Sequence, residues 1–66
     1  MNGSEEFVTP EEVADWLRVP VATIYKLARE GVLPGFKVGR HWRFRNEAIE
    51  QWVLNRERTS IRTENV

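Results

Sequence analysis

Cysteine, clustered histidines and long apolar runs are all missing from this sequence, and each absence excludes a class of protein. Without cysteine, neither a disulfide nor a thiolate zinc site can stabilise the fold, which fits a cytosolic setting. The single histidine excludes a multi-histidine metal site. No run of about 18 apolar residues occurs, and Glu5 and Glu6 lie where a signal peptide would carry basic residues. We therefore expect no secretion signal and no membrane-spanning helix.

The chain is short: its 66 residues make one small domain, which limits the size of the hydrophobic core. Such a domain buries only about 60% of the surface that its unfolded chain exposes, so its core depends on a few large side chains. We interpret Trp16, Trp42 and Trp52 as core residues; the alternative role is base stacking with a single strand. Isolated Ser, Asp and His residues show no spacing typical of nucleophilic catalysis. We predict no enzymatic activity, no catalytic residue, no metal and no cofactor.

The zero net charge conceals a strong segregation of charge along the chain. Residues 1–17 contain five acidic residues and no basic one, whereas residues 18–45 contain seven basic residues and one acidic residue. Residues 46–66 are nearly balanced, with three basic and four acidic residues. A basic segment with aromatic residues between its arginines indicates a surface for a polyanion. The alternative is an ordinary solvated face.

Two short helices separated by a tight turn are expected in the first half of the chain. Thr9, Pro10 and Glu12 have the spacing of a capping box with proline at the first helical position, and Pro20 stops this helix near Leu17 or Arg18. A second helix starts near Pro20, carries an apolar stripe of Ile24, Leu27 and Ala28, and ends at Gly31. The opposite face of the second helix consists of Ala22, Lys26 and Arg29, flanked by Thr23 and Tyr25.

A β-hairpin and a third helix follow. Residues 36–45 alternate with period two, and Gly39 can supply the positive φ that a two-residue turn requires. We expect one apolar face, made by Phe36, Val38, Trp42 and Phe44, and one basic face, made by Lys37, Arg43 and Arg45, with Arg40 at the tip. Asn46 caps the third helix, whose apolar positions are Ile49, Trp52 and Val53. From residue 57 onward the chain is polar without apolar periodicity, so we expect disorder there.

Several spaced motifs resemble the excisionase family of small DNA-binding proteins, which is related to MerR-type domains. They are FVTPEEVA at residues 7–14, Val19-Pro20, TIYKL at residues 23–27, REGVLP at residues 29–34 and KVGRHWRF at residues 37–44. The resemblance implies a mainly α fold with a small β-hairpin wing: a winged helix-turn-helix of three short helices plus a two-stranded antiparallel hairpin. It also implies that the second helix enters the major groove and that the wing lies on the adjoining backbone or minor groove.

Matching positions assign roles to particular residues. Thr23 and Tyr25 are similar to the family's backbone-contacting pair, Lys26 occupies a position that is usually basic, and the turn at Arg40 resembles the wing tip. The chain departs from the family at Pro20, Val21 and Ala22, which offer no hydrogen bonds to base edges but can touch a thymine methyl group. His41 replaces a frequent Arg or Lys. The complete set of expected DNA-binding residues is Ala22, Thr23, Tyr25, Lys26, Arg29, Lys37, Arg40, His41, Arg43 and Arg45.

We therefore predict a winged helix-turn-helix domain at residues 7–56, between an N-terminal tail at 1–6 and a polar C-terminal tail at 57–66. The expected function is double-stranded DNA binding, as an excisionase-like accessory factor of recombination or a small transcriptional regulator in the cytoplasm. The alternative is a protein-interaction adaptor on the same scaffold. Partners implied by the resemblance are a recombinase or integrase, or further copies on adjacent DNA sites. A monomer is expected in free solution, because the residues after Val53 are too few for a coiled coil.

Overall fold

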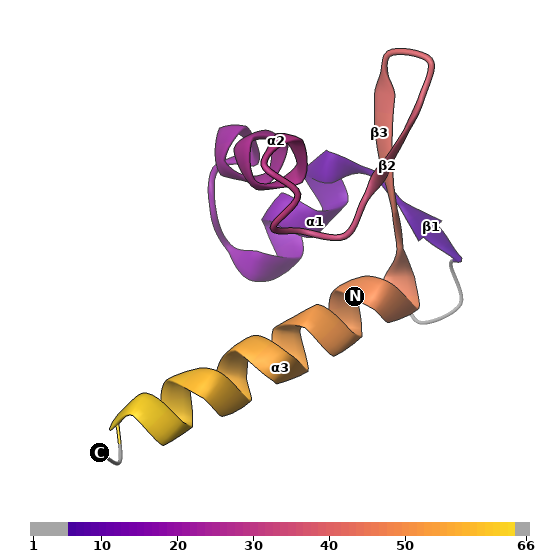
Figure 1. The fold of residues 1–66 in the computed structure, drawn as a ribbon. Coiled ribbons are helices and arrows are strands. Elements are labelled where there is room, and N and C mark those ends of the chain that lie inside the picture. Colours follow the sequence, from indigo (N-terminus) through magenta and orange to yellow (C-terminus); the bar gives the residue numbers. More distant parts are fainter. Residues whose placement is uncertain (1–5, 65–66) are drawn as a thin grey trace.

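Three helices and a small antiparallel sheet make up the part of the protein that the structure describes. The computed structural model describes residues 6–64, with side chains through residue 59. The elements in chain order are β1 (Phe7–Val8), α1 (Pro10–Leu17), α2 (Val21–Arg29), β2 (Phe36–Val38), β3 (His41–Arg45) and α3 (Asn46–Glu64) (Figure 1). The mainly helical fold with a hairpin is the predicted winged helix-turn-helix class. One strand more than predicted is present, since β1 adds to the hairpin.

The helix-turn-helix forms where the sequence signals place it. The Thr9 Oγ1 atom accepts a hydrogen bond from the Glu12 backbone N–H at 3.1 Å, and the Glu12 carboxylate accepts one from the Thr9 backbone N–H at 2.8 Å. The predicted capping box is thus confirmed. Arg18 ends α1 in the left-handed conformation with φ of 60°. Pro20 then precedes α2 as its N-cap. The predicted bounds of both helices hold within two residues.

Strand β1 was not predicted from the sequence, and it brings Glu6, the residue before it, to the end of the sheet. The sheet order is β1-β3-β2, and β1 pairs with β3 through Phe7 opposite Arg45 and Val8 opposite Phe44. The backbone carbonyl of Glu6 accepts a hydrogen bond from the Asn46 N–H at 2.9 Å. Glu6, which was assigned to the N-terminal tail, therefore contacts the end of the sheet. Residues 1–5 of that predicted tail lie outside the described residues.

Helix α3 is longer than predicted. It begins at Asn46 as expected but continues through Glu64, whereas the sequence predicted a disordered tail from residue 57. The backbone of residues 57–64 is helical, which corrects the helix boundary. The physical reason is that no Pro or Gly follows Gly39, so nothing in the sequence ends the helix even where its apolar period is lost. The Trp52 indole N–H donates to the Val32 carbonyl at 2.8 Å and fixes α3 against the segment after α2.

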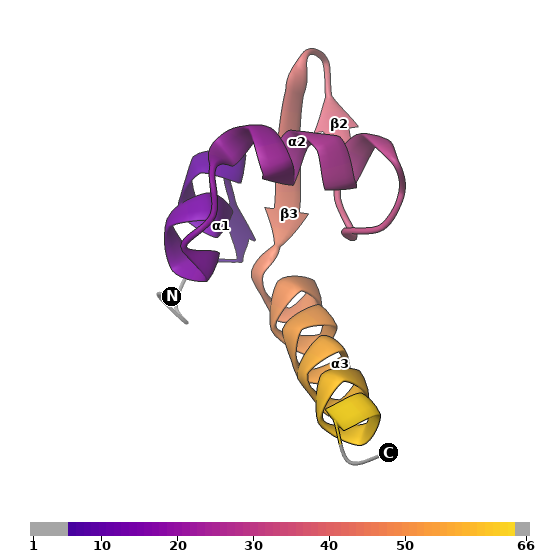
Figure 2. The same ribbon diagram turned by 90° about the vertical axis from the view of Figure 1, so that its left-hand side faces the viewer.

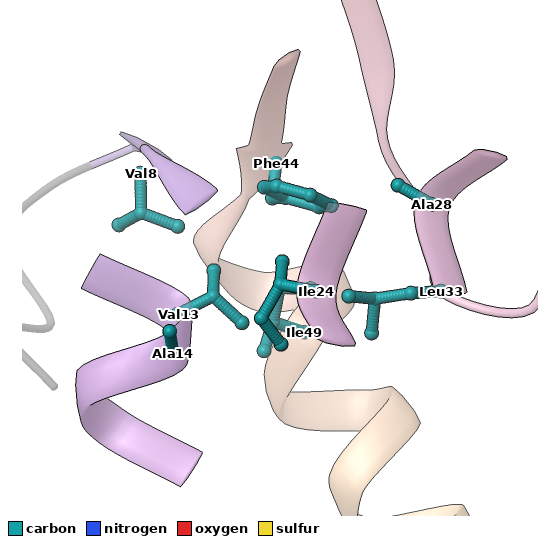
Figure 3. Packing of buried hydrophobic residues seen from close by; sticks show 8 residues of the cluster. All are labelled: Val8, Val13, Ala14, Ile24, Ala28, Leu33, Phe44 and Ile49. Carbon is teal, nitrogen blue, oxygen red and sulfur yellow. The ribbon is translucent and has the colours of Figure 1, made fainter. Parts of the chain in front are cut away.

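The core lies between the helices and one face of the sheet. Its buried apolar residues are Val8, Val13, Ala14, Ile24, Ala28, Leu33, Phe44 and Ile49 (Figure 3). The three Trp residues are half-buried and pack against this cluster, as their assignment to the core predicted. Phe44, with no exposed surface, is its largest fully buried member. Its ring stacks on Trp42, with centroids 6.4 Å apart.

The predicted division of the hairpin into an apolar and a basic face is wrong. The two-residue turn pairs Val38 with His41, Lys37 with Trp42 and Phe36 with Arg43. Directly opposite residues of an antiparallel pair share one face of the sheet, so alternation changes phase across the turn. The inner face, which meets the helices, carries Lys37, Trp42 and Phe44. We call the opposite side the outer sheet face; it carries Phe7, Phe36, Val38, His41, Arg43 and Arg45.

Candidate nucleic-acid interface

The outward face of α2 carries five of the predicted DNA-binding residues. Burial of Ile24 and Ala28 fixes the rotation of the helix about its axis. Ala22, Lys26 and Arg29 consequently lie exposed on the opposite side, with Thr23 and Tyr25 half-buried at the flanks. This is the arrangement that helical periodicity predicted. It presents two cations and two hydroxyl groups along one face of a single helix.

The hairpin extends this surface beyond the helix. Figures 1 and 2 show the β2–β3 hairpin rising past α2, which crosses in front of it in Figure 2. Arg40 lies at the tip, next to Gly39, whose φ of 64° lets the turn form. Lys37 lies on the inner face, with its Nζ atom 5.8 Å from the centroid of the Trp42 ring. Lys26, Arg29, Lys37 and Arg40 thus belong to the side of the molecule that α2 and the hairpin form together.

The remaining predicted residues, His41, Arg43 and Arg45, lie on the outer sheet face. The Arg43 guanidinium donates to the carbonyl oxygen of Trp42 at 2.7 Å, which directs it along its own strand. Arg45 forms an ion pair with Glu6 at 3.2 Å and lies over the Phe7 ring, 4.8 Å from its centroid. The structure therefore divides the predicted set into seven residues that share a surface with α2 and three that do not.

A contact that the sequence did not reveal connects α1 to this interface. The Tyr25 hydroxyl donates a hydrogen bond to a Glu11 carboxylate oxygen at 3.4 Å. A phenol has one proton to donate, so Tyr25 cannot donate to a phosphate while this bond persists. The carboxylate also adds a negative charge beside a surface that is otherwise cationic. The only sequence signal was the presence of two acidic residues, Glu11 and Glu12, in the first turn of α1.

Replacing Glu11 by Gln is expected to strengthen duplex binding. The substitution removes one like charge from the neighbourhood of phosphate, which corresponds to about a threefold to fivefold gain in affinity for charges in water. Glu57→Gln, an exposed position on α3, is the matched control and should leave affinity unchanged. Fluorescence anisotropy with a labelled duplex measures both. Equal affinities for Glu11→Gln and the unmodified protein would show that Glu11 lies outside the range of the DNA charge.

The described part of the chain contains neither a cluster of metal-ligating residues nor a membrane-spanning helix. No group of three or more His, Asp or Glu residues that could hold a metal ion occurs within residues 6–64. Among the helices of the same range, none is long and apolar enough to cross a membrane.

Comparison with known proteins gives an independent result. The family described as "Helix-turn-helix domain" matches residues 7–57. Uncharacterized protein YvgK of Bacillus subtilis (strain 168) is 42% identical over 55 residues, which cover 83% of this chain and 18% of that relative. The chain thus spans less than a fifth of the relative's length. No solved structure matches the chain significantly.

Proposed function

The chain belongs to the helix-turn-helix domain family, and from this premise we propose that it binds double-stranded DNA through α2 and the β2–β3 hairpin. The observation that carries the proposal is that α2 lies on the inner face of the sheet and the hairpin extends past it on the same side (Figure 2). Four cations lie on that side: Lys26, Arg29, Lys37 and Arg40. The proposed contact residues are these four together with Ala22, Thr23 and Tyr25.

The mechanism begins with electrostatics. Cations that neutralise phosphates release condensed counterions, which supplies sequence-independent affinity. Helix α2 fixes the register in the major groove, where Ala22 offers a methyl group to thymine and Lys26 can reach a base edge or a phosphate. The tip of the hairpin adds backbone contacts at Arg40. Such a small module gains affinity from a partner protein or from further copies on adjacent sites.

In the cell we propose that the domain acts as an accessory factor of recombination or as a transcriptional regulator, without enzymatic activity of its own. The resemblance to excisionases supports the first role and suggests a recombinase as the partner. The much longer relative supports a different arrangement, in which such a module is one part of a larger protein. At tens of micromolar the free domain is proposed to be a monomer.

Alanine substitutions in α2 and at the hairpin tip test the two halves of the proposed interface. Arg40→Ala should weaken binding to all duplexes by a similar factor and reduce the salt slope by about 1, because it removes a phosphate contact. Lys26→Ala should weaken binding by factors that differ between duplex sequences, since α2 lies against base edges. Anisotropy titrations over a panel of duplexes measure both effects.

Arg58→Ala is the matched control, because it removes the same charge as Arg40→Ala from the exposed surface of α3. It should retain full affinity. If all three variants lost affinity equally, binding would depend on net charge alone and the assignment to α2 and the hairpin would be wrong. An absence of duplex binding by the unmodified protein would favour the adaptor hypothesis.

A further inference from the structure

The outer sheet face carries three of the six large apolar residues that are exposed in the described part of the chain. Phe7, Phe36 and Val38 are 42%, 43% and 59% exposed, and the pairing of the strands places all three on this one face. Isolated exposed apolar residues are ordinary, but apolar residues gathered on one face indicate a contact with another molecule. Nothing in the proposed DNA interface uses this face, because α2 packs on the other side of the sheet.

Four side chains of this face, those of Phe7, Phe36, Arg43 and Arg45, are held by contacts with their neighbours. The Phe7 and Phe36 rings meet edge to face with centroids 5.8 Å apart. The Arg45 guanidinium covers one side of Phe7, and Arg43 is half-buried and bonded to a backbone carbonyl. Aromatic residues and arginines are enriched at protein interfaces, and ordered side chains lose little entropy on binding. Arg45 is already paired with Glu6, so the face is suited to an apolar contact whose rim offers a carboxylate to Arg43.

A surface of matching charge lies elsewhere on the same chain. Helix α1 exposes Glu11, Glu12 and Asp15, and residues 1–17 contain no lysine or arginine. Within the described residues, no basic side chain forms an ion pair with these carboxylates. We call this surface the acidic face of α1. Val19, which follows α1 in the chain and is 36% exposed, offers an apolar group.

The two surfaces cannot meet within one molecule. Val13 and Ala14 of α1 are buried in the core with Val8 and Phe44, which lie on the inner face of the sheet (Figure 3). The acidic face of α1 therefore points away from the sheet, and the outer sheet face points away from α1. Charge complementarity between two opposite sides of one chain is satisfied by a second copy placed beside the first.

We propose that the outer sheet face binds the acidic face of α1 of a second copy. The contact is heterologous, because the two surfaces differ, so each pair leaves one surface of each kind free and further copies can add. It is weak in free solution, where small charged contacts gain little energy. Copies bound side by side on DNA have a high effective concentration and would therefore bind cooperatively. Only this last consequence depends on the proposed DNA-binding function.

Two variants that each lose one of the surfaces test the proposal without DNA. The first, Phe36→Ser with Arg43→Glu, loses the outer sheet face and keeps α1. The second, Glu12→Gln with Asp15→Lys, keeps the outer sheet face and loses the acidic face of α1. Sedimentation at about 1 mM, where weak contacts become populated, should show association of the unmodified protein. Each variant alone should stay monomeric, and a mixture of the two should form a 1:1 pair that grows no further.

Several outcomes would overturn this proposal. They are a monomeric unmodified protein at this concentration, self-association of either variant alone, and failure of the mixed variants to pair. Circular dichroism checks that each variant is folded; if the first is not, Val38→Ser with Arg43→Gln replaces it, since Val38 is the most exposed residue of the face. Because no DNA is present, loss of the proposed DNA-binding function would leave the result of this experiment unchanged.

Discussion

A rise in salt from 50 to 200 mM is expected to weaken duplex binding by about 150-fold. Each neutralised phosphate contributes about −0.9 to the slope of the logarithm of the binding constant against the logarithm of salt concentration. Four cations share the surface of α2 and the hairpin, namely Lys26, Arg29, Lys37 and Arg40. If all four meet phosphates, the slope is about −3.6. Anisotropy titrations of one duplex at several salt concentrations measure this slope directly.

The value of the slope distinguishes between two arrangements of the basic residues. Had Arg43 and Arg45 pointed at DNA with the rest, six cations would give a slope near −5.4. The structure places both on the outer sheet face, and Arg45 already pairs with Glu6. Arg43→Gln should therefore leave the slope unchanged, whereas Lys37→Gln should reduce it by about 1. A slope near zero for the unmodified protein would contradict duplex binding through this surface.

Local signals sufficed to predict the helix-turn-helix. Thr9, Pro10 and Glu12 define the start of α1, Pro20 separates the two helices, and the apolar stripe of α2 fixes which side of that helix faces outward. These features act within one or two turns of helix, so a single sequence contains them. The residues on the outward face of α2 were predicted for this reason, and they are five of the seven residues of the candidate interface.

Features that depend on pairing between distant segments were not predictable in the same way. Strand β1 has two residues, too few for a periodic pattern, and forms because β3 offers it a partner. In the hairpin, the alternation of residue types was correct, but the faces follow from which residues the turn sets opposite each other. Because Val38 pairs with His41, Lys37 lies on the inner face of the sheet, toward α2. Arg43 and Arg45 lie on the outer sheet face instead. This one detail of register decides which cations share the candidate interface.

The contact of Gly35 with the core also depends on pairing between distant segments, so it was not predictable from local signals. Continuing the pairing of the hairpin by one residue places Gly35 opposite Phe44. A Cβ atom built at Gly35 would lie 2.5 Å and 2.7 Å from two carbons of the Phe44 ring and 3.3 Å from the Arg43 carbonyl oxygen. The ring can lie against the backbone only because residue 35 has no side chain. No local sequence signal at Gly35 indicates this contact.

Phe44→Ala is expected to leave the domain largely unfolded at room temperature. Removing a buried Phe costs about 3–5 kcal/mol, and a domain of this size has a total stability of only about 3–10 kcal/mol. Phe44 is fully buried, stacks on Trp42 and contacts Gly35, so few neighbours can move in to fill the space. Urea denaturation followed by circular dichroism measures the loss. A variant with nearly unchanged stability would show that the core does not depend on this ring.

Gly35→Ala tests the close approach itself, and its effect should depend on the ring. Overpacking typically costs about 1–3 kcal/mol, and here the added methyl group must displace a buried aromatic side chain rather than a flexible one. In Phe44→Leu the smaller side chain leaves room, so Gly35→Ala should cost distinctly less in that background than in the unmodified protein. The difference is the coupling energy between the two positions. Equal costs in both backgrounds would mean that the methyl group clashes with the backbone near Arg43 instead, and that the need for glycine comes from the strand rather than from the core.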